Sequence, residues 1–323
     1  MLTLRVAFAI LEKTHRPMSR RVFDEISGLT TESPHPRSRD LDAWPTRRIL
    51  ELMSDEDAGV AAAVRAVLPD VERAVEKVCD AFRAGGRLIY VGAGTSGRLG
   101  ILDAAECPPT FGSRPEQVVG VIAGGNEAVF RSKEGAEDDA LRGSADLEQL
   151  GVTERDAVFG ITASRRTPYV LGALKTARQA GAATVLLICN PPPEHRGDPP
   201  PADVIIAPVP GPEIIMGSTR LKAGTATKMI LNMVTTAAFI RLGKVYRGMM
   251  VDLHAGSEKL KERSKRVLML AAGLSYEEAE TVLQGSGGSV KTALVMSLCR
   301  LSRAEAEEAL RRSDGFVRRV IGK

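Results

Sequence analysis

The chain has few of the residues that mark metal centres or disulfide frameworks. Its 323 residues include only four cysteines and four histidines, and no two cysteines form a C-x-x-C pair. Zinc sites need closely spaced ligands, and small disulfide-stabilised domains need many paired cysteines, so neither class is expected. The sequence therefore predicts no metal and no cofactor, and its scattered thiols favour a reducing, cytoplasmic location.

Aromatic residues and net charge are also scarce. Aromatics make up 4% of the chain, the net charge is +4, and no dense basic stripe alternates with aromatic side chains. This composition argues against a nucleic-acid partner. The apolar run within residues 1–13 is far too short to span a membrane, and no small-residue cleavage site follows it. We expect a globular protein with no membrane partner.

The most informative stretch lies between residues 87 and 112. Leu88–Val91 is a short apolar run that is typical of a buried strand, and a helix is expected from about Arg98. Between them lie three glycines and two hydroxyl residues: Gly92, Gly94, Thr95, Ser96 and Gly97. Glycines let main-chain N–H groups approach an anion, hydroxyls add donors, and the helix N-terminus is electropositive. The stretch predicts a phosphate-binding loop.

The same glycine spacing fits a dinucleotide site, and a simple tight turn is a further alternative. A dinucleotide site needs an acidic residue at the end of the second strand, about twenty positions on. Here the second strand, Val118–Ala123, runs into Gly124-Gly125 without an acid. A phosphate on a small sugar is therefore favoured over a nucleotide.

Apolar strands alternate with helices along the first three quarters of the chain, which predicts a parallel sheet covered on both faces. The expected strands are Leu88–Val91, Val118–Ala123, Ala157–Thr162, Thr184–Cys189 and Val204–Ala207. Before them, helices are expected over 55–68 and over 71–83, the second capped by Asp70. From about Ser257 the pattern is helical only, with the capping boxes Ser275-x-x-Glu278 and Ser302-x-x-Glu305.

A second hydroxyl cluster follows the third strand, at residues 162–167. Thr167-Pro168 fits an N-cap and the first residue of a helix, so Thr167 could serve simply as a cap. Ligands bind beyond the carboxyl ends of parallel strands. Ser164 is therefore a candidate second phosphate donor.

Several long motifs resemble the N-acetylmuramic acid 6-phosphate etherases, which belong to the sugar-isomerase (SIS) fold group. The matching motifs, in order from about Ile26, are TTESPHPRSRDLD (30–42), GAGTSGRLGILDAAECPPTFG (92–112), AGG (123–125), EGAEDD (134–139), TPYV (167–170) and GPEIIMGSTRLKAGTATKMILNM (211–233). The resemblance implies an α/β, three-layer SIS domain over 26–256, with the 30–42 loop near the substrate. It implies a C-terminal helical, UBA-like bundle over 257–323. Residues 1–25, and above all those before Met18, are interpreted as an extension.

The resemblance also implies a reaction and a set of site residues. Members cleave the D-lactyl ether of N-acetylmuramic acid 6-phosphate by elimination and hydration, which gives N-acetylglucosamine 6-phosphate in cell-wall sugar recycling. The implied acid/base residues are Glu106 in DAAECPP and Glu137 in EGAEDD. Glu106 is expected at the end of a helix that Pro108-Pro109 stops, where the helix field should raise its pKa. The implied substrate and phosphate contacts are Gly94, Thr95, Ser96, Gly97, Ser164, Thr167, Ser218 and Lys222.

Two further expectations follow from the resemblance. SIS sites are commonly completed across a dimer interface, so a homodimer is implied. The family usually carries glycine where this chain has Arg165, and this departure places a bulky cation in the second phosphate loop and leaves its detailed geometry open. Two alternatives stay open, namely a sugar-phosphate sensor similar to glucokinase regulatory protein and an isomerase with Glu213 as its base.

Overall fold

The computed structural model describes residues 22–23, 25–192, 200–253 and 257–322. Most of the expected N-terminal extension, residues 1–21 and 24, therefore lies outside the described residues. The centre of the molecule is a five-stranded parallel sheet with strand order β2-β1-β3-β4-β5. Its strands are β1 Leu88–Gly92, β2 Val118–Ile122, β3 Ala157–Ile161, β4 Ala183–Leu187 and β5 Val204–Ile206. All five expected strands are confirmed.

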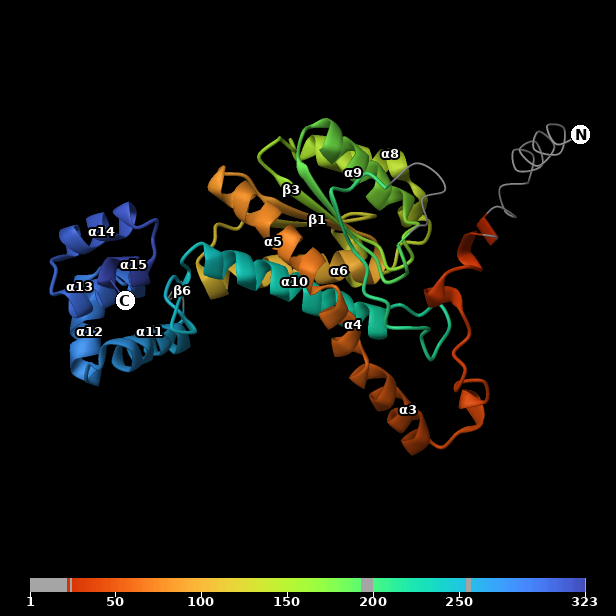
Figure 1. The fold of residues 1–323 in the computed structure, drawn as a ribbon, viewed down its shortest axis with the longest axis horizontal. Helices are drawn as coiled ribbons and strands as arrows, with labels where there is room; N and C mark the ends of the chain where they lie inside the picture. Colours follow the sequence, from red (N-terminus) through yellow and green to blue (C-terminus); the bar gives the residue numbers. More distant parts are fainter. Residues whose placement is uncertain (1–21, 24, 193–199, 254–256, 323) are drawn as a thin grey trace, which may run out of the picture.

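Helices cover both faces of this sheet, so alternate residues of each strand enter different cores. Leu88 and Tyr90 of β1 pack with α4 (Val60–Ala66), α5 (Leu68–Arg83), α6 (Gly94–Phe111) and α10 (Lys222–Arg241). Ile89 and Val91 pack with α8 (Ala140–Gln149) and α9 (Pro168–Gln179) on the other face. Figure 1 shows α8 and α9 on one side of the sheet and α5, α6 and α10 on the other. The three-layer SIS-type architecture is confirmed.

The helices before the sheet begin and end at other residues than expected. The expected helix over 55–68 is wrong, because α3 runs over Thr46–Ala58 and α4 over Val60–Ala66, with Gly59 between them. Asp70 is not an N-cap, since α5 begins at Leu68 with a proline in its first turn, a position that suits proline's missing N–H. Helix α3 extends away from the body of the molecule (Figure 1).

Helix α6 continues through the two prolines that were expected to stop it. It ends only at Gly112, which has φ +61° and donates its N–H to the Pro108 carbonyl at 3.0 Å. Phe111 in the last turn stacks on Phe239 of α10, with ring centroids 4.7 Å apart. Tertiary packing thus outweighs the hydrogen bonds that Pro108 and Pro109 cannot donate.

Several short elements and the C-terminal helices complete the fold. The short elements are η1 Thr30–Glu32, η2 Leu41–Ala43, α7 Glu127–Phe130, η3 Ala136–Asp138, β6 Val245–Tyr246 and β7 Met249–Met250. The C-terminal helices are α11 Glu258–Ala272, α12 Tyr276–Gly285, α13 Val290–Cys299, α14 Arg303–Arg312 and α15 Val317–Ile321.

The C-terminal helices pack around an apolar core of their own, set to one side of the sheet domain (Figure 1). Both expected capping boxes, at Ser275 and Ser302, are present. The helical character of this region is confirmed. Its likeness to a UBA domain stays a prediction, as does the domain boundary, which falls next to residues 254–256 outside the described ranges.

Candidate functional site

The two predicted phosphate loops meet at the carboxyl edge of the sheet. Strands β1 and β3 are neighbours in register, with Gly92 beside Ile161, so the loops that follow them lie next to each other. Strand β1 has β2 on its other side, so the chain leaves β1 and β3 at the point where the strand order reverses. Such a switch point is the usual ligand crevice of an open parallel sheet.

The three glycines of the first loop serve two different purposes. A Cβ on Gly92 would lie 2.5 Å from the Gly97 nitrogen, and one on Gly97 would lie 2.6 Å from Ile122 Cγ1. These two glycines therefore allow close packing between strand and helix. Gly94 instead has φ +52° with open space around its Cα, so it shapes a turn that faces outward. The tight-packing interpretation therefore applies to Gly92 and Gly97, and the anion-binding interpretation applies to Gly94.

The donors of this loop are available to a ligand. Thr95 and Ser96 are half-buried, and neither side chain forms a hydrogen bond with any residue that the structure describes. They occupy the first turn of α6, where main-chain N–H groups have no partner within the helix. The first turn of α10 lies alongside, because a Cβ on Gly224 would be 3.7 Å from Thr95 Cγ2. Hydroxyls, amides and a helix N-terminus thus converge on one place.

Glu137 shares a cavity with this loop. The cavity has a volume of about 160 Å³ and is lined by Ala93, Gly94, Arg98, Ala123, Ala128, Ser132, Lys133, Glu134, Gly135, Ala136 and Glu137. Desolvation by the surrounding chain and the charge of Asp138 raise the pKa of Glu137, although its side chain keeps access to solvent, while Arg166 acts in the opposite direction. A carboxylate with a raised pKa beside an anion site suits proton transfer.

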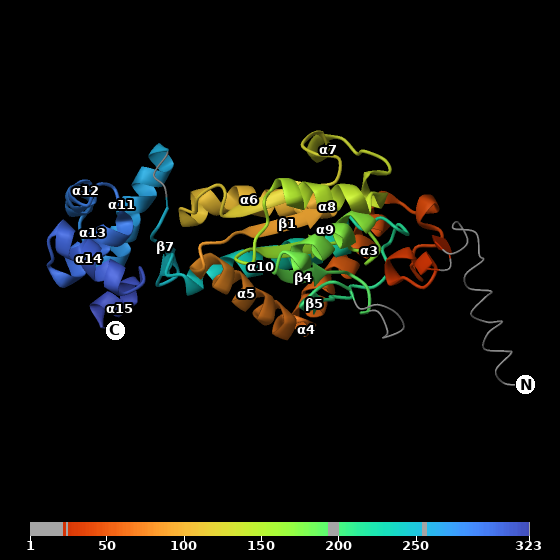
Figure 2. The ribbon, with the colours of Figure 1, turned by 90° about the horizontal axis from the view of Figure 1, so that it is seen from above.

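Arg98 holds the wall of this cavity in place. Its guanidinium donates from Nε to the Val129 carbonyl and from Nη2 to the Ala128 carbonyl, each over 2.7 Å. These acceptors end α7, which projects from the body beside α6 (Figure 2). Arg98 thus connects the helix of the phosphate loop to the segment that leads to Glu137.

Glu106 lies elsewhere on α6 and does not line that cavity. It is exposed, three helical turns beyond Thr95, which at 1.5 Å per residue is about 16 Å along the axis. The preceding turn is anchored by Asp103, which accepts hydrogen bonds from Tyr90 of β1 at 2.9 Å and Asn232 of α10 at 2.6 Å. The turn of α6 that precedes Glu106 is therefore held firmly in place. Of the two glutamates, only Glu137 lies beside the phosphate loop.

In the second hydroxyl loop, residues 162–167, some of the hydroxyl groups form hydrogen bonds within the loop. Thr167 stands at the N-cap position of α9, but its side chain caps nothing and instead shares a 2.7 Å hydrogen bond with the Thr162 hydroxyl. The expected side-chain cap is therefore wrong. Ser164 is half-buried and accepts only a 3.4 Å bond from the Arg166 N–H.

Arg165 adopts a backbone conformation that favours glycine. Its φ is +60°, in the left-handed region that a side chain occupies only at a cost of about 1–2 kcal/mol. The guanidinium points out of the loop and donates to the Pro191 carbonyl at 3.0 Å. Arg165 therefore has the backbone conformation that a glycine would have at this position, and its cationic side chain lies on the outside of the loop.

The segment before α10 also reaches the site, but two of its residues are committed to other partners. Both carboxylate oxygens of Glu213 accept main-chain N–H groups at the start of α10, from Lys222 at 3.0 Å and Ala223 at 2.9 Å. Burial raises the pKa of Glu213, and these bonds limit the rise. The proposed base of the isomerase alternative is thus a helix cap. Ser218 is half-buried, with no side-chain hydrogen bond to any described residue.

Lys222 is buried and its Nζ lies 2.6 Å from Oε2 of Glu56 on α3. Burial disfavours the charge on Glu56, but hydrogen bonds from Lys222 and Arg37 outweigh it and lower the Glu56 pKa to about 2. His35 completes this cluster with its Nε2 at 3.2 Å from Glu56. Lys222 thus holds α3 and the N-terminal loop against α10, and a role in phosphate binding stays a prediction.

Asn190 attaches the N-terminal loop to the carboxyl edge of the sheet. Its Oδ1 accepts the Thr30 N–H at 2.7 Å, and its Nδ2 donates to the Ala163 carbonyl at 2.8 Å. The 30–42 loop therefore begins beside the second hydroxyl loop. Sequence reasoning identified neither Asn190 nor Arg98. The position of Arg98 one turn after the phosphate loop was a usable signal, whereas Asn190 gave none.

Across the described ranges, no group of three or more His, Cys, Asp or Glu side chains could hold a metal ion. Within the same ranges, no helix is long and apolar enough to cross a membrane.

Comparison with known proteins gives consistent matches over almost the whole chain. Residues 70–178 match the model of the glucokinase regulatory protein N-terminal SIS domain. An N-acetylmuramic acid 6-phosphate etherase from Salinibacter ruber is 54% identical over 94% of this chain and 97% of its own length. Etherases from a Geobacillus species and from Photorhabdus laumondii are 51% and 49% identical over 91% and 92% of this chain, and over 98% and 97% of their own lengths. The chain belongs to the N-acetylmuramic acid 6-phosphate etherase family.

Proposed function

We propose that this protein cleaves the D-lactyl ether of N-acetylmuramic acid 6-phosphate and releases D-lactate and N-acetylglucosamine 6-phosphate. The observation that carries this proposal is the 54% identity to an etherase over 94% of the chain. The anion-binding loop beside a carboxylate of raised pKa supports it independently. The relatives do not favour the sensor or isomerase alternatives, and the capping role of Glu213 leaves the isomerase without its base.

The reaction needs proton transfers but no redox step. In the open-chain sugar the aldehyde acidifies the C2 proton, which a carboxylate removes. The C3–O bond then breaks, and lactate leaves with a proton from an acid. Water adds to C3 of the unsaturated intermediate while C2 regains a proton, so the net change is the addition of one water across the ether. Glu137 and Glu106 are the proposed acid/base groups, and the residues that begin α6 are the proposed phosphate site.

The positions of these groups support a homodimer with a shared site. Glu106 lies about 16 Å along α6 from Thr95, and a hexose 6-phosphate is shorter than this from its phosphate to C2. Glu106 of one chain therefore cannot reach C2 of a sugar whose phosphate sits on its own loop. We infer that the loop and Glu137 of one subunit work with Glu106 of its partner. The exposure of Glu106 suits this role.

The function is tested by incubating the purified protein with N-acetylmuramic acid 6-phosphate and assaying D-lactate. We expect stoichiometric release of lactate and of the phosphosugar. An isomerase would convert an aldose phosphate to a ketose phosphate without lactate, and a sensor would bind without turnover. Absence of lactate release from folded protein would overturn the proposal.

The shared site is tested by mixing two inactive variants, Glu106→Gln and Glu137→Gln, under conditions that exchange subunits. In each mixed dimer one site then combines an intact Glu137 with the partner's intact Glu106. Random mixing makes half of the dimers mixed with one working site each, so activity should recover to about a quarter of the wild-type value. If both glutamates acted within one chain, no mixed site would be complete and activity would stay absent.

A further inference from the structure

The cavity of about 160 Å³ beside the phosphate loop, which we call the Glu137 cavity, has small apolar walls that phosphate binding does not need. Ala93, Ala123, Ala128 and Ala136 line it together with Glu137. They come from four segments, namely the ends of β1 and β2, α7 and η3. Alanine methyl groups offer no hydrogen bonds and leave room for a small apolar group. The Glu137 cavity therefore favours a ligand that carries such a group.

The ammonium group of Lys133, which also lines the cavity, can exchange its partner for a ligand. A Cβ on Gly124 would lie 3.0 Å from Lys133 Cδ, so the glycine leaves room for the lysine stem just beyond the end of β2. The Lys133 Nζ lies 3.0 Å from Oε2 of Glu127, and the two side chains are 43% and 84% exposed. An ion pair this exposed contributes little to stability. An anionic ligand can therefore take the place of Glu127.

The second cation in the lining, Arg98, is less able to move. Its Nε and Nη2 donate to main-chain carbonyls and fix the orientation of the guanidinium. Glu134 and Glu137 add negative charge to the same cavity, which would repel a carboxylate that entered it alone. Lys133 is thus the group that suits the Glu137 cavity to an anionic substituent.

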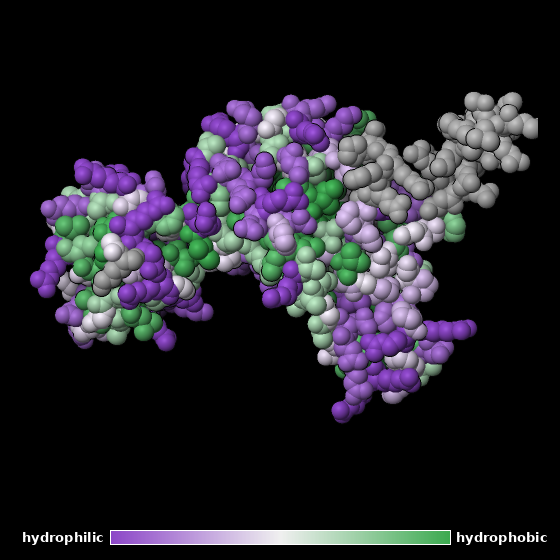
Figure 3. Space-filling view, in the orientation of Figure 1, coloured by the Kyte–Doolittle hydropathy of each residue, from purple (hydrophilic) through white to green (hydrophobic). Residues whose placement is uncertain are grey.

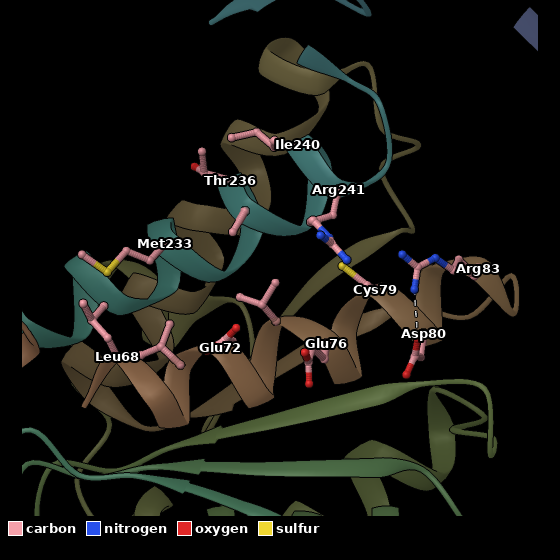
Figure 4. A pocket seen from close by; sticks show the side chains of 13 residues that line it. Leu68, Glu72, Glu76, Cys79, Asp80, Arg83, Met233, Thr236, Ile240 and Arg241 are labelled. Carbon is pink, nitrogen blue, oxygen red and sulfur yellow. Dashed lines mark hydrogen bonds and ion pairs between the residues drawn. The ribbon is translucent and has the colours of Figure 1, made fainter. Parts of the chain in front are cut away.

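A larger groove of about 880 Å³ does not share these features. It lies between α5 and α10, where Figure 3 shows hydrophobic side chains that reach the surface among hydrophilic ones. All of its lining residues belong to these two helices, and Figure 4 shows one of its cations, Arg83, directed toward Asp80 at 3.0 Å. The Glu137 cavity instead includes Gly94 of the phosphate loop, so a substituent of a bound phosphosugar is assigned to it.

The substituent of the proposed substrate has three different groups, namely an ether oxygen, a methyl group and a carboxylate. We propose that the Glu137 cavity is the lactyl subsite, in which Lys133 binds the carboxylate, the alanines enclose the methyl group and Glu137 faces the ether oxygen. This rests on the proposed function and names the residue that distinguishes the substrate from its phosphosugar product. After the base has taken the C2 proton, the electrons of the C3–O bond go to the lactyl oxygen, which takes its proton from Glu137.

Binding measurements test the role of Lys133 without turnover. In the Glu106→Gln background, calorimetry compares N-acetylmuramic acid 6-phosphate with N-acetylglucosamine 6-phosphate, which lacks the lactyl group. Lys133→Met keeps the stem and removes the charge, so it should weaken binding of the first ligand at least about tenfold and of the second less than about twofold. Lys133→Arg keeps the charge and should stay within about threefold for both. Lys175→Met, at an exposed position of α9 outside the cavity, is the matched control.

Substrate analogues test the same contact from the side of the ligand. The lactyl carboxamide is neutral, so it should bind at least about tenfold more weakly than the acid, and Lys133→Met should bind the two alike. Discrimination that survives in Lys133→Met would show that another cation binds the carboxylate. The L-lactyl epimer exchanges the places of methyl and carboxylate and should bind more weakly than the D form. Equal binding of the epimers would overturn the separate places of these groups.

The outcomes separate the lactyl subsite from the proposed function. In the wild-type background, Lys133→Met should raise KM for the lactyl ether at least about tenfold and leave the inhibition constant of N-acetylglucosamine 6-phosphate unchanged. Lactate release with equal effects on both ligands, or with none, would overturn the subsite alone. Wild-type protein that binds the lactyl ether through Lys133 and releases no lactate would overturn the proposed function and leave the subsite standing.

Discussion

The Nε of Arg98 and the main-chain carbonyl of Val129 are 2.7 Å apart, which fastens the helix of the phosphate loop to the end of α7. A second hydrogen bond, from Nη2 of Arg98 to the Ala128 carbonyl, strengthens this contact. A cation one turn after an anion-binding loop would ordinarily be assigned to the phosphate. Here Nε and Nη2 donate to main-chain acceptors, which fixes the orientation of the guanidinium, so we expect Arg98 to act on the ligand site through the segment it holds.

Replacement of Arg98 should therefore impair turnover more than phosphate binding. We expect Arg98→Ala to lower kcat by at least about tenfold, equal to about 1.4 kcal/mol, while the affinity for N-acetylglucosamine 6-phosphate stays within a few-fold. Amide hydrogen exchange of residues 126–139 should quicken. Arg142→Ala, which removes an ion pair between an exposed arginine and Asp146 on α8, is the matched control. A large loss of phosphate affinity with unchanged exchange would instead place Arg98 on the ligand.

Ser96 should discriminate phosphorylated from unphosphorylated sugar. Its hydroxyl has no hydrogen-bond partner among the described residues, so Ser96→Ala leaves no buried group unsatisfied. Binding of N-acetylglucosamine 6-phosphate should weaken by about 1–2 kcal/mol, the scale of a hydrogen bond to a charged group. Calorimetry with the unphosphorylated sugar should show little change. Equal losses for both ligands would make the loop structural.

The pH profile should report Glu137. With Glu106 as the group that takes the C2 proton, Glu137 is the acid that protonates the departing lactate, so the rate should fall as pH rises through the Glu137 pKa, which is raised above its ordinary value. Arg166 lowers that pKa, and Arg166→Ala should move the basic limb of kcat/KM to higher pH. Asp138→Asn removes a neighbouring negative charge and should move it to lower pH. Profiles that shift in the same direction in both variants would contradict the assignment.

Arg165→Gly should stabilise the protein slightly and leave it active. Relief of about 1–2 kcal/mol of left-handed strain exceeds the extra chain entropy of glycine, about 0.5–1 kcal/mol. We expect a small rise in Tm and turnover within about tenfold of wild type. Arg165→Ala keeps the strain and loses the bond to Pro191, so it should be no more stable than wild type. Complete inactivity of Arg165→Gly would show that this chain uses the cation in its site.

Glu106→Gln should abolish catalysis while leaving affinity intact. Glutamine keeps the shape of the side chain but cannot accept the C2 proton, so lactate release should fall at least about a hundredfold. The variant should also fail to exchange the C2 hydrogen of the product with deuterated solvent. Glu116→Gln, an exposed glutamate outside the proposed site, controls for loss of charge. Exchange at the wild-type rate would exclude Glu106 as the base.

The strands of the sheet and most of the first phosphate loop could be predicted from the sequence. The strands were predictable because each is an apolar run between turn residues, and parallel pairing follows from the helices between them. The end of α6 was not predictable, because the prolines that signal a stop are overridden by the stacking of Phe111 on Phe239, a contact between distant segments. The role of Arg98 was not predictable for the same reason, because its acceptors are main-chain atoms about 30 residues away.

The bond between Thr30 and Asn190 joins residues 160 positions apart. Loop-closure entropy must be overcome before such a distant contact contributes, so we expect it to form after the more local contacts. The other bond of Asn190 is to Ala163 at the end of β3, so we expect Asn190 to reach its final place after β4 has joined β3. During refolding, the segment around Thr30 should therefore stay sensitive to protease after the sheet has gained hydrogen-exchange protection. If the 30–42 loop contributes to the substrate site, activity should appear only with that docking step.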